Sequence, residues 1–377
     1  MTTFKQFEDE RHLLKYSTPE QSKCTWLSFQ GIKVPLYRFG SQSLTDVGPS
    51  GGLSCIPEEE QSILDSLLLA QWEERMWKGL FKYDVTTSEI KVIGGKRKFL
   101  AQLNKGWNMD CFPVPEENNV CHKGRPFVFN WMKDHEELLF CVAHGEKANP
   151  ELIPAAAVPN GAILILINAT PVEYGHVFLV PCGYSSLFKF LDARSLDMVT
   201  RIAVEINHCS FCLFYDCCTP SASHPYFQGC YFPNPLPVEL LPVMTLFGDG
   251  QAGIRICQVT DYPIRALLFE SNDNLKVLVE VVAEICSCLL GKNIPYNLLI
   301  SDCGKKMFLF PQLQTLASSC TLSAWECGGY FLFKSGYEFD CATEEAMIKR
   351  LNAVSLDDEG FQAVNQLCCS IASKFTS

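Results

Sequence analysis

The stretch of sequence that decides the fold reads GAILILINATPVEYGHVFLVP at residues 161–181. Its first run, residues 163–169, is apolar at successive positions, which is typical of a strand buried on both faces at the centre of a sheet. Residues 171–175 contain Pro171 and Gly175 and predict a turn. The run that follows, residues 176–180, predicts a second strand. We therefore expect a pair of central strands joined by a short connection.

A second motif follows about forty residues later, where the chain reads Ser223-His224-Pro225-Tyr226-Phe227-Gln228. Residues 224–232 are predicted to form a strand, and residues 212–215 another one before it. Because side chains alternate between the two faces of a strand, we expect His224, Tyr226 and Gln228 to lie on one face. These polar side chains are the first candidates for a functional site.

The rest of the chain predicts a mixture of helices and strands. Apolar residues recur at three- and four-residue steps over residues 62–80, 195–206 and 275–290, which predicts three amphipathic helices, and the chain after Thr343 is also expected to be helical. Further strands are predicted at residues 99–104, 127–130 and 138–142, and a hairpin at 297–300 and 307–310 around Asp302-Cys303-Gly304. Within residues 1–60, an expected N-terminal extension and loop, residues 31–37 form a short ordered-looking island.

Composition limits the class of protein. The chain has 377 residues, of which 47% are hydrophobic, and a formal net charge of −11 with a pI near 5.2. This balance argues against a general binder of nucleic acid or anionic membranes. We see no secretory signal and no apolar run of about 18 residues, so we expect a cytosolic protein, with a nuclear location also open.

The chain contains 20 cysteines, which in such a compartment are expected to be reduced thiols. The nearest approach to a cluster is Cys209, Cys212, Cys217 and Cys218, but its spacing is irregular and no paired histidines accompany it. We therefore expect no metal site and no cofactor.

Several segments in the same order resemble the plant-type GDP-L-galactose phosphorylase family, a HIT-like family that is similar to the animal GDP-D-glucose phosphorylases. The matching stretches are LLLAQWEERM at 67–76, GLFKYDV at 79–85, AQLN at 101–104, INATPVEYGHV at 167–177, NLLISDCG at 297–304 and FLFPQ at 308–312, together with the island at 31–37. The resemblance implies an α+β, HIT-like fold, an antiparallel sheet with packed helices in which two HIT-like halves could be fused. We expect one such domain at residues 61–375, with the motif strands at about 161–232 and a C-terminal half at about 255–375.

The resemblance also implies a reaction. Family enzymes split a GDP-hexose in two steps, in which a histidine attacks the α-phosphorus, holds GMP covalently and passes it to inorganic phosphate. Imidazole suits this role because it is both a good nucleophile and a good leaving group at neutral pH. The family motif is His-x-His-x-Gln, whose second histidine is the nucleophile, while its first histidine and its glutamine position the ring and stabilise the phosphoryl oxygens.

This chain departs from the family where the chemistry should be. The nucleophile position holds Tyr226. Phe214 stands where the family has an asparagine expected to contact the ligand, and Cys217 stands where the family has a glycine. Ser223 stands where the family has an asparagine before the first histidine, and residues 108–113 replace a basic stretch of the family. Tyr330 stands where the family has a histidine in its C-terminal part. A phenol has a pKa near 10, so little phenolate exists at pH 7. We expect that the family reaction does not run normally.

These observations leave three functions open. The first is a non-catalytic protein that binds a small ligand in the old nucleotide-sugar pocket or a partner, with a dimer of itself or with an active relative as one form of such binding. The second is a repurposed enzyme that uses Tyr226, Tyr215, Asp216 and His224 for acid–base work on another substrate. The third is residual GDP-hexose phosphorolysis.

Single residues of the motifs also carry two interpretations each. We expect catalytic roles for Tyr226, His224 and Gln228. We expect ligand contacts from Asn168, Phe214, Tyr215, Asp216 and Ser223. His224 could instead be a leftover of the old site, and Gln228 a hydrogen-bonded scaffold residue. Asn168 could touch a ligand or cap a turn, and His176 is best interpreted as structural. The loop at residues 94–98, with Lys96, Arg97 and Lys98, is either phosphate-facing or a solvated turn.

Overall fold

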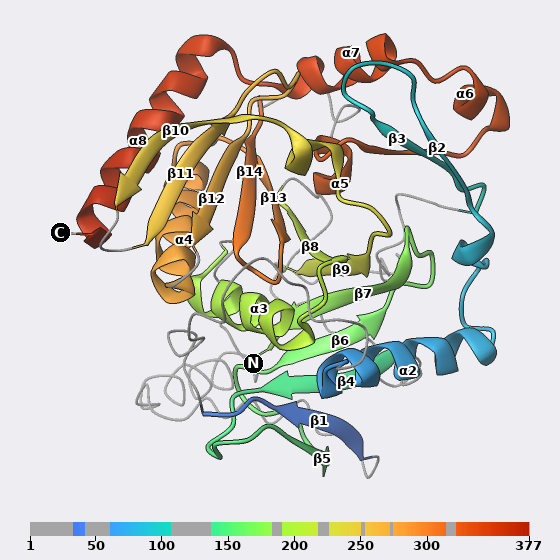
Figure 1. Ribbon diagram of the computed structural model, residues 1–377. Helices are drawn as coiled ribbons and strands as arrows, with labels where there is room; N and C mark the ends of the chain where they lie inside the picture. The colour runs from blue at the N-terminus through green and yellow to red at the C-terminus, as the bar shows by residue number, and fades with distance from the viewer. Residues whose placement is uncertain are drawn as a thin grey trace, which may run out of the picture.

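The computed structural model describes residues 33–41, 61–106, 137–182, 191–217, 226–249, 253–271, 274–313 and 322–376. In this part of the chain one twelve-stranded sheet runs through the molecule (Figure 1), in the order β10-β11-β12-β14-β13-β8-β9-β7-β6-β4-β1-β5. Neighbouring strands are antiparallel except β1 and β4, which are parallel. The strands are β1 (Val34–Arg38), β4 (Leu138–Ala143), β5 (Glu151–Ala155), β6 (Ile163–Ile167), β7 (Tyr174–Pro181), β8 (Phe211–Asp216), β9 (Phe227–Tyr231), β10 (Val243–Asp249), β11 (Ile254–Val259), β12 (Leu267–Ser271), β13 (Tyr296–Ser301) and β14 (Lys306–Pro311).

A second, three-stranded sheet brings together distant parts of the chain. Its order is β15-β3-β2, with β15 (Tyr330–Phe333) parallel to β3 (Leu100–Leu103) and β2 (Glu89–Val92) antiparallel to β3. The helices are α2 (Ile63–Trp77), α3 (Ala193–Ile206), α4 (Leu275–Gly291), α5 (Ala324–Cys327), α6 (Gly336–Asp340), α7 (Glu344–Val354) and α8 (Asp358–Thr376), with 3-10 turns at Val85–Thr87 and Pro237–Leu240.

The large sheet repeats one arrangement twice. In the first half the chain runs β6-β7-α3-β8-β9, and the strands lie in the order β8-β9-β7-β6. In the second half it runs β11-β12-α4-β13-β14, and the order is β13-β14-β12-β11. The halves meet where β8 pairs antiparallel with β13, with Phe214 opposite Leu299. Two similar halves are therefore fused through a continuous sheet.

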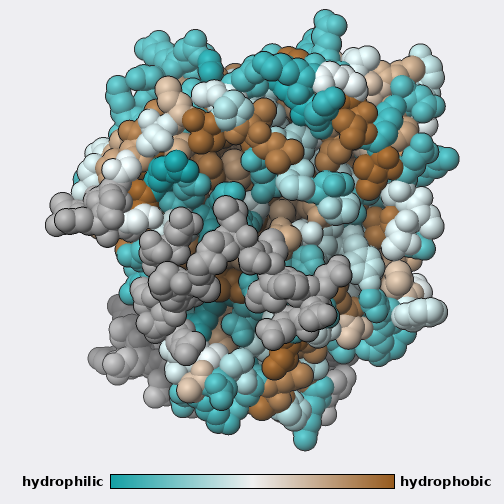
Figure 2. All heavy atoms as spheres, viewed as in Figure 1, coloured by the Kyte–Doolittle hydropathy of each residue, from teal (hydrophilic) through white to brown (hydrophobic). Residues whose placement is uncertain are grey.

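Different elements pack on the two faces of the large sheet. On one face, apolar side chains of α2, α3, α4 and α8 pack against the strands and form the largest buried cluster. On the other face, the small sheet and α5 to α7 cover the strands around the junction of the halves. A third cluster, with Leu164, Leu166 and Phe178, lies on that same face towards β1 and β4. On the side that Figure 2 shows, hydrophobic side chains lie scattered among hydrophilic ones.

The helices begin and end where local chemistry requires it. Ser62 caps α2 by accepting a hydrogen bond from the Asp65 amide, and Gly79, at φ +73°, ends the segment. Asp192 caps α3 in the same way through the Ser195 amide. The buried stripe of α3 includes Leu196, Val199 and Ile202, as its periodicity predicts. The three amphipathic helices predicted at residues 62–80, 195–206 and 275–290 are confirmed as α2, α3 and α4. The helices predicted after Thr343 are confirmed as α7 and α8.

The strand predictions are confirmed in most places and incomplete in others. Strand β6 is buried at every position, and β13 and β14 form the predicted hairpin, with Asp302, Cys303 and Gly304 at positive φ. The predicted strand at 127–130 lies outside the described residues. The island at 31–37 contains β1, which pairs with β4 and β5. Strands β2, β5, β10, β11, β12 and β15 are absent from the sequence prediction.

None of the helices in the described ranges is long and apolar enough to cross a bilayer. Among the same residues, no group of three His, Cys, Asp or Glu side chains is placed to hold a metal ion.

Candidate functional site

The candidate site lies on the face of the sheet formed by β7, β8 and β9. Gln228 on β9 lies opposite Phe178 on β7 and Phe214 on β8, so these three side chains share one face. Tyr226 precedes β9, and its ring contacts Phe178 edge-on with centroids 5.6 Å apart. Tyr226 and Gln228 therefore lie on the same side of the sheet, as the alternation predicts.

A buried hydrogen-bond chain runs across this face from a histidine to a carboxyl group. The Val172 amide donates to Nδ1 of His176 at 2.9 Å, so Nδ1 is an acceptor and the neutral ring carries its proton on Nε2. His176 Nε2 then donates to Oε1 of Gln228 at 3.1 Å. Gln228 Nε2 lies 3.5 Å from Oδ2 of Asp216, at the end of β8. The Gln228 amide is thus oriented from both ends.

Burial sets the charge of the two titratable groups in this series of hydrogen bonds, His176 and Asp216. It lowers the pKa of His176 to about 4, because an imidazolium in this apolar surrounding would be desolvated. It raises the pKa of Asp216 to about 7, although the hydrogen bond from the Ala324 amide acts in the opposite direction. Glu326 raises the Asp216 pKa further by repulsion between like charges. His176 is therefore neutral at pH 7, and Asp216 is poised near its titration point.

The short helix α5 closes this face. The Ala324 amide donates to Oδ1 of Asp216 at 2.7 Å, and the Trp325 ring meets the rings of His176 and Phe214 edge-on, at 6.1 and 5.7 Å. Cys327 holds the other end of α5, because its carbonyl accepts from the Tyr262 hydroxyl at 2.7 Å.

A second buried polar pair links this face to the small sheet. The Tyr330 hydroxyl donates to Oε1 of Glu173, which lies in the connection before β7. Burial raises the pKa of Glu173 to about 7, while the bond from Tyr330 lowers it. Both side chains are buried, so the pair joins β15 to the site through the core.

The structure brings only some of the sequence-predicted site residues together. Gln228, Phe214, Asp216 and Tyr226 lie on one face, whereas Tyr215 points to the opposite face, where its ring packs against Phe227 with centroids 5.2 Å apart. His224 and Ser223 lie outside the described residues.

Asn168 caps a turn in the structure, and its contact with a ligand stays a prediction. Its Oδ1 accepts from the amide and the hydroxyl of Thr170, at 2.9 and 3.0 Å. Its Nδ2 lies 3.4 Å from Nδ1 of His176, so the turn also supports the histidine.

Other residues of this face were not among the predicted site residues. His176 is interpreted from the sequence as structural, yet it is the direct partner of Gln228; its place in the INATPVEYGHV motif is the signal for it. Trp325 reaches the site through contacts between distant segments, for which one sequence carries no signal, whereas Glu173 lies in the same INATPVEYGHV motif.

In the second half of the sheet, the three central strands carry apolar side chains opposite one another. Phe308 on β14 lies opposite Leu268 on β12 and Leu299 on β13, as Gln228 on β9 lies opposite Phe178 and Phe214. In the part of the chain that the structure describes, the polar site belongs to the first half.

Comparisons with known proteins agree with this architecture. Residues 63–230 match the family model described as GDPGP1-like, N-terminal domain, and residues 237–375 match GDPGP1-like, C-terminal domain. The chain is 34% identical over 356 residues to GDP-L-galactose phosphorylase 1 of Arabidopsis thaliana, covering 89% of this chain and 80% of that protein. It is 25% identical over 341 residues to human GDP-D-glucose phosphorylase 1, covering 84% and 86%.

Among solved structures, the yeast Ap4A phosphorylase Apa2 in complex with AMP has the same fold. The TM-score is 0.52 at 14% sequence identity, over 78% of this chain and 96% of that one. The fold is therefore α+β and HIT-like, as the resemblance predicts. Together, the two family models and the 34% identity to a GDP-hexose phosphorylase show that this chain belongs to the GDPGP1-like family.

Proposed function

We propose that this chain is a diverged GDP-hexose phosphorylase that no longer transfers a guanylyl group through a histidine, and that it acts as a non-catalytic protein binding a ligand or a partner. The observation that carries the proposal is the residue at the nucleophile position. Tyr226 stands there, and its ring packs edge-on against Phe178 at the rim of an apolar cluster.

The chemistry of a phenol supports this proposal. A tyrosine with a pKa near 10 is almost wholly protonated at pH 7, so it is a poor nucleophile towards phosphorus unless neighbouring cations lower that pKa. Imidazole, which the family uses, needs no such help.

The electrostatics of the neighbouring site support it as well. The charged group that acts on Asp216 is Glu326, another carboxylate, which itself forms an ion pair with Arg350. A GDP-hexose brings two negative charges, and an ionised Asp216 beside its phosphates would repel it. The site therefore favours a ligand with less negative charge than a nucleoside diphosphate, or a role in which the scaffold meets a partner such as an active relative.

A repurposed enzyme is the second candidate, favoured by the pKa of about 7 for Asp216. A carboxyl group poised at neutral pH can both donate and accept a proton. Since Tyr215 faces away from Asp216, such an enzyme would rely on Asp216 and Tyr226, with His224 as a further candidate. Residual phosphorolysis of a GDP-hexose remains the third candidate.

A test of the lost nucleophile is to look for the covalent intermediate directly. The purified protein is incubated with GDP-glucose or GDP-L-galactose without phosphate and analysed by intact mass spectrometry. We expect no protein-bound GMP in the wild type or in Tyr226→Phe, while GDP-L-galactose phosphorylase 1 of Arabidopsis thaliana serves as the positive control. Bound GMP that disappears in Tyr226→Phe would identify Tyr226 as a working nucleophile and overturn the proposal. Bound GMP that persists in Tyr226→Phe would show that another residue is the nucleophile, and it would also overturn the proposal.

A further inference from the structure

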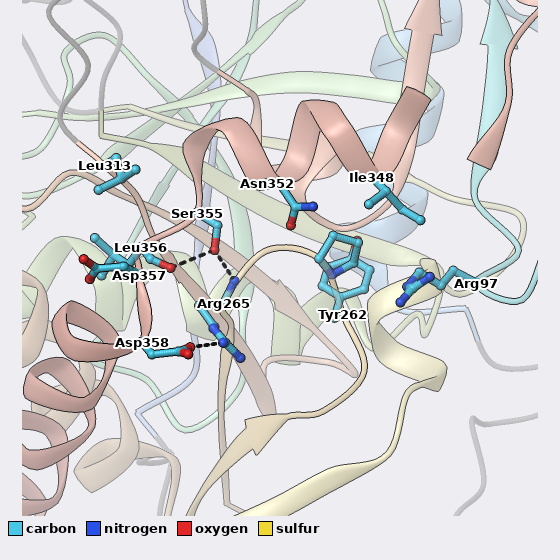
Figure 3. Close-up of a pocket in the computed structure, with 11 residues that line it drawn as sticks. Arg97, Tyr262, Arg265, Leu313, Ile348, Asn352, Ser355, Leu356, Asp357 and Asp358 are labelled. Atoms are coloured by element: carbon cyan, nitrogen blue, oxygen red, sulfur yellow. Dashed lines mark hydrogen bonds and ion pairs between the residues drawn. The ribbon is translucent and has the colours of Figure 1, made fainter. Parts of the chain in front are cut away.

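A groove with a volume of about 610 Å³ lies away from the candidate site, between α7, the turn that leads into α8, and the connection from β11 to β12. Figure 3 shows Arg97 at one end of it, beside Tyr262, and Arg265 with Asp358 at the other. None of its lining residues belongs to the Tyr226–Gln228 site. Its volume lies in the range of pockets that take small molecules.

The groove offers an apolar surface on a fixed frame. Leu313 is 43% exposed, and Ile348 and Leu356 also line the groove. Tyr262 is buried, and its hydroxyl donates to the Cys327 carbonyl, which fixes the ring. The Arg265 amide donates to the Ser355 hydroxyl at 3.1 Å and ties the loop to the end of α7. The walls are therefore held by hydrogen bonds without a ligand.

The positive groups of the groove lie deeper than the negative ones. The side chains of Arg97 and Arg265 are 20% and 36% exposed, whereas that of Asp358, the ion-pair partner of Arg265, is 88% exposed. An ion pair with so exposed a carboxylate contributes little free energy. Asp357 is engaged elsewhere, because its Oδ1 accepts from the Gly360 amide at 2.8 Å. An incoming anion could replace Asp358 on Arg265 at small cost.

Arg97 is oriented by its neighbours. Its Nε donates to the Asp261 carbonyl at 3.2 Å, its Nη2 lies 3.3 Å from the Asp261 carboxylate, and its Nη1 lies 3.9 Å from that of Glu344. These contacts engage Nε and Nη2 and position the guanidinium at the wall of the groove, and the remaining N–H groups of the five leave donor capacity for a further acceptor.

From this arrangement we propose that the groove binds a small organic anion, a carboxylate or a phosphate monoester with an apolar body. Arg97 and Arg265 supply planar donors that match either anionic group, and Leu313 and Ile348 contact the apolar part. The inference is independent of the proposed function, since it concerns a different part of the molecule.

Calorimetry with two probes, phenyl phosphate and phenylacetate, tests this site on the full chain. We expect at least one of them to bind, and the better of the two identifies the preferred anionic group. Arg97→Gln and Arg265→Gln should each weaken binding about tenfold through loss of a charge-assisted hydrogen bond. Arg265→Lys should weaken it less, and Asp358→Asn should bind at least as tightly as the wild type.

The matched control is Arg194→Gln, which removes an exposed arginine from α3, and it should leave binding unchanged. Circular dichroism confirms that each variant is folded. The proposal is overturned if neither anion binds, if both glutamine variants bind as tightly as the wild type, or if the neutral probe benzyl alcohol binds as well as the anions.

Discussion

Replacing His176 by alanine is expected to lower the free energy of unfolding by about 3–5 kcal/mol, because it leaves a cavity in the core and several polar groups without partners. The ring is fully buried, accepts from the Val172 amide and donates to Gln228. Its loss would leave both groups buried and unpaired. It would also remove the ring that Trp325 contacts, so α5 would lose part of its support.

The measurement is urea denaturation of the His176→Ala variant and of the wild type at pH 7.5. His208→Ala is the matched control, because His208 is exposed, and it should cost less than about 1 kcal/mol. If His176→Ala were as mild as His208→Ala, the chain of hydrogen bonds from His176 to Asp216 would not exist as described.

Replacing Tyr330 by phenylalanine is expected to cost about 2–3 kcal/mol at pH 8 and about 1 kcal/mol at pH 5.5. Tyr330 donates to Glu173 inside the core. At pH 8, above the Glu173 pKa of about 7, the carboxylate is charged, and removing its donor leaves a buried charge without a partner. At pH 5.5 the carboxyl group is protonated, so only a neutral hydrogen bond is lost.

Glu173 also sets a pH dependence of its own. Burial raises its pKa from an ordinary 4.5 to about 7, so between these pH values the folded chain keeps a proton that the unfolded chain gives up. Its contribution to stability is therefore fully present below about pH 4.5 and is lost as pH rises to about 7. Glu173→Gln carries no such group and should flatten that part of the profile.

Both effects can be read from melting temperatures of the variants between pH 5 and pH 8.5. Tyr337→Phe is the control for the tyrosine change, since Tyr337 is 78% exposed and should change stability by less than about 0.5 kcal/mol. A pH-independent cost of Tyr330→Phe would mean that Glu173 does not titrate in this range, and would contradict the buried pair.

The sequence predicts the parts of the fold that rest on local patterns. The continuous apolar run of β6 and the capped, periodic α3 are recognised because their signals lie within a few residues. Strands β2 and β15 are short and depend on pairing with β3, so local patterns do not reveal them. The resemblance anticipates two fused halves, and the strand order shows that they repeat one arrangement.

For the site, sequence reasoning finds Tyr226 and Gln228 because they share a motif and a face of a strand. It assigns Tyr215 and Asp216 together, but neighbours along a strand point to opposite faces, and the structure separates them. The link from Asp216 to Ala324 joins residues 108 positions apart, so it depends on tertiary packing alone.

The central claim is that the chain no longer carries out guanylyl transfer. The most direct test is phosphate-dependent release of GDP from GDP-L-galactose and from GDP-glucose by the purified protein, with GDP-L-galactose phosphorylase 1 of Arabidopsis thaliana assayed in parallel. We predict no GDP above background with either substrate. Phosphate-dependent GDP formation at rates typical of enzymes would contradict the claim, and the family reaction would then stand despite Tyr226.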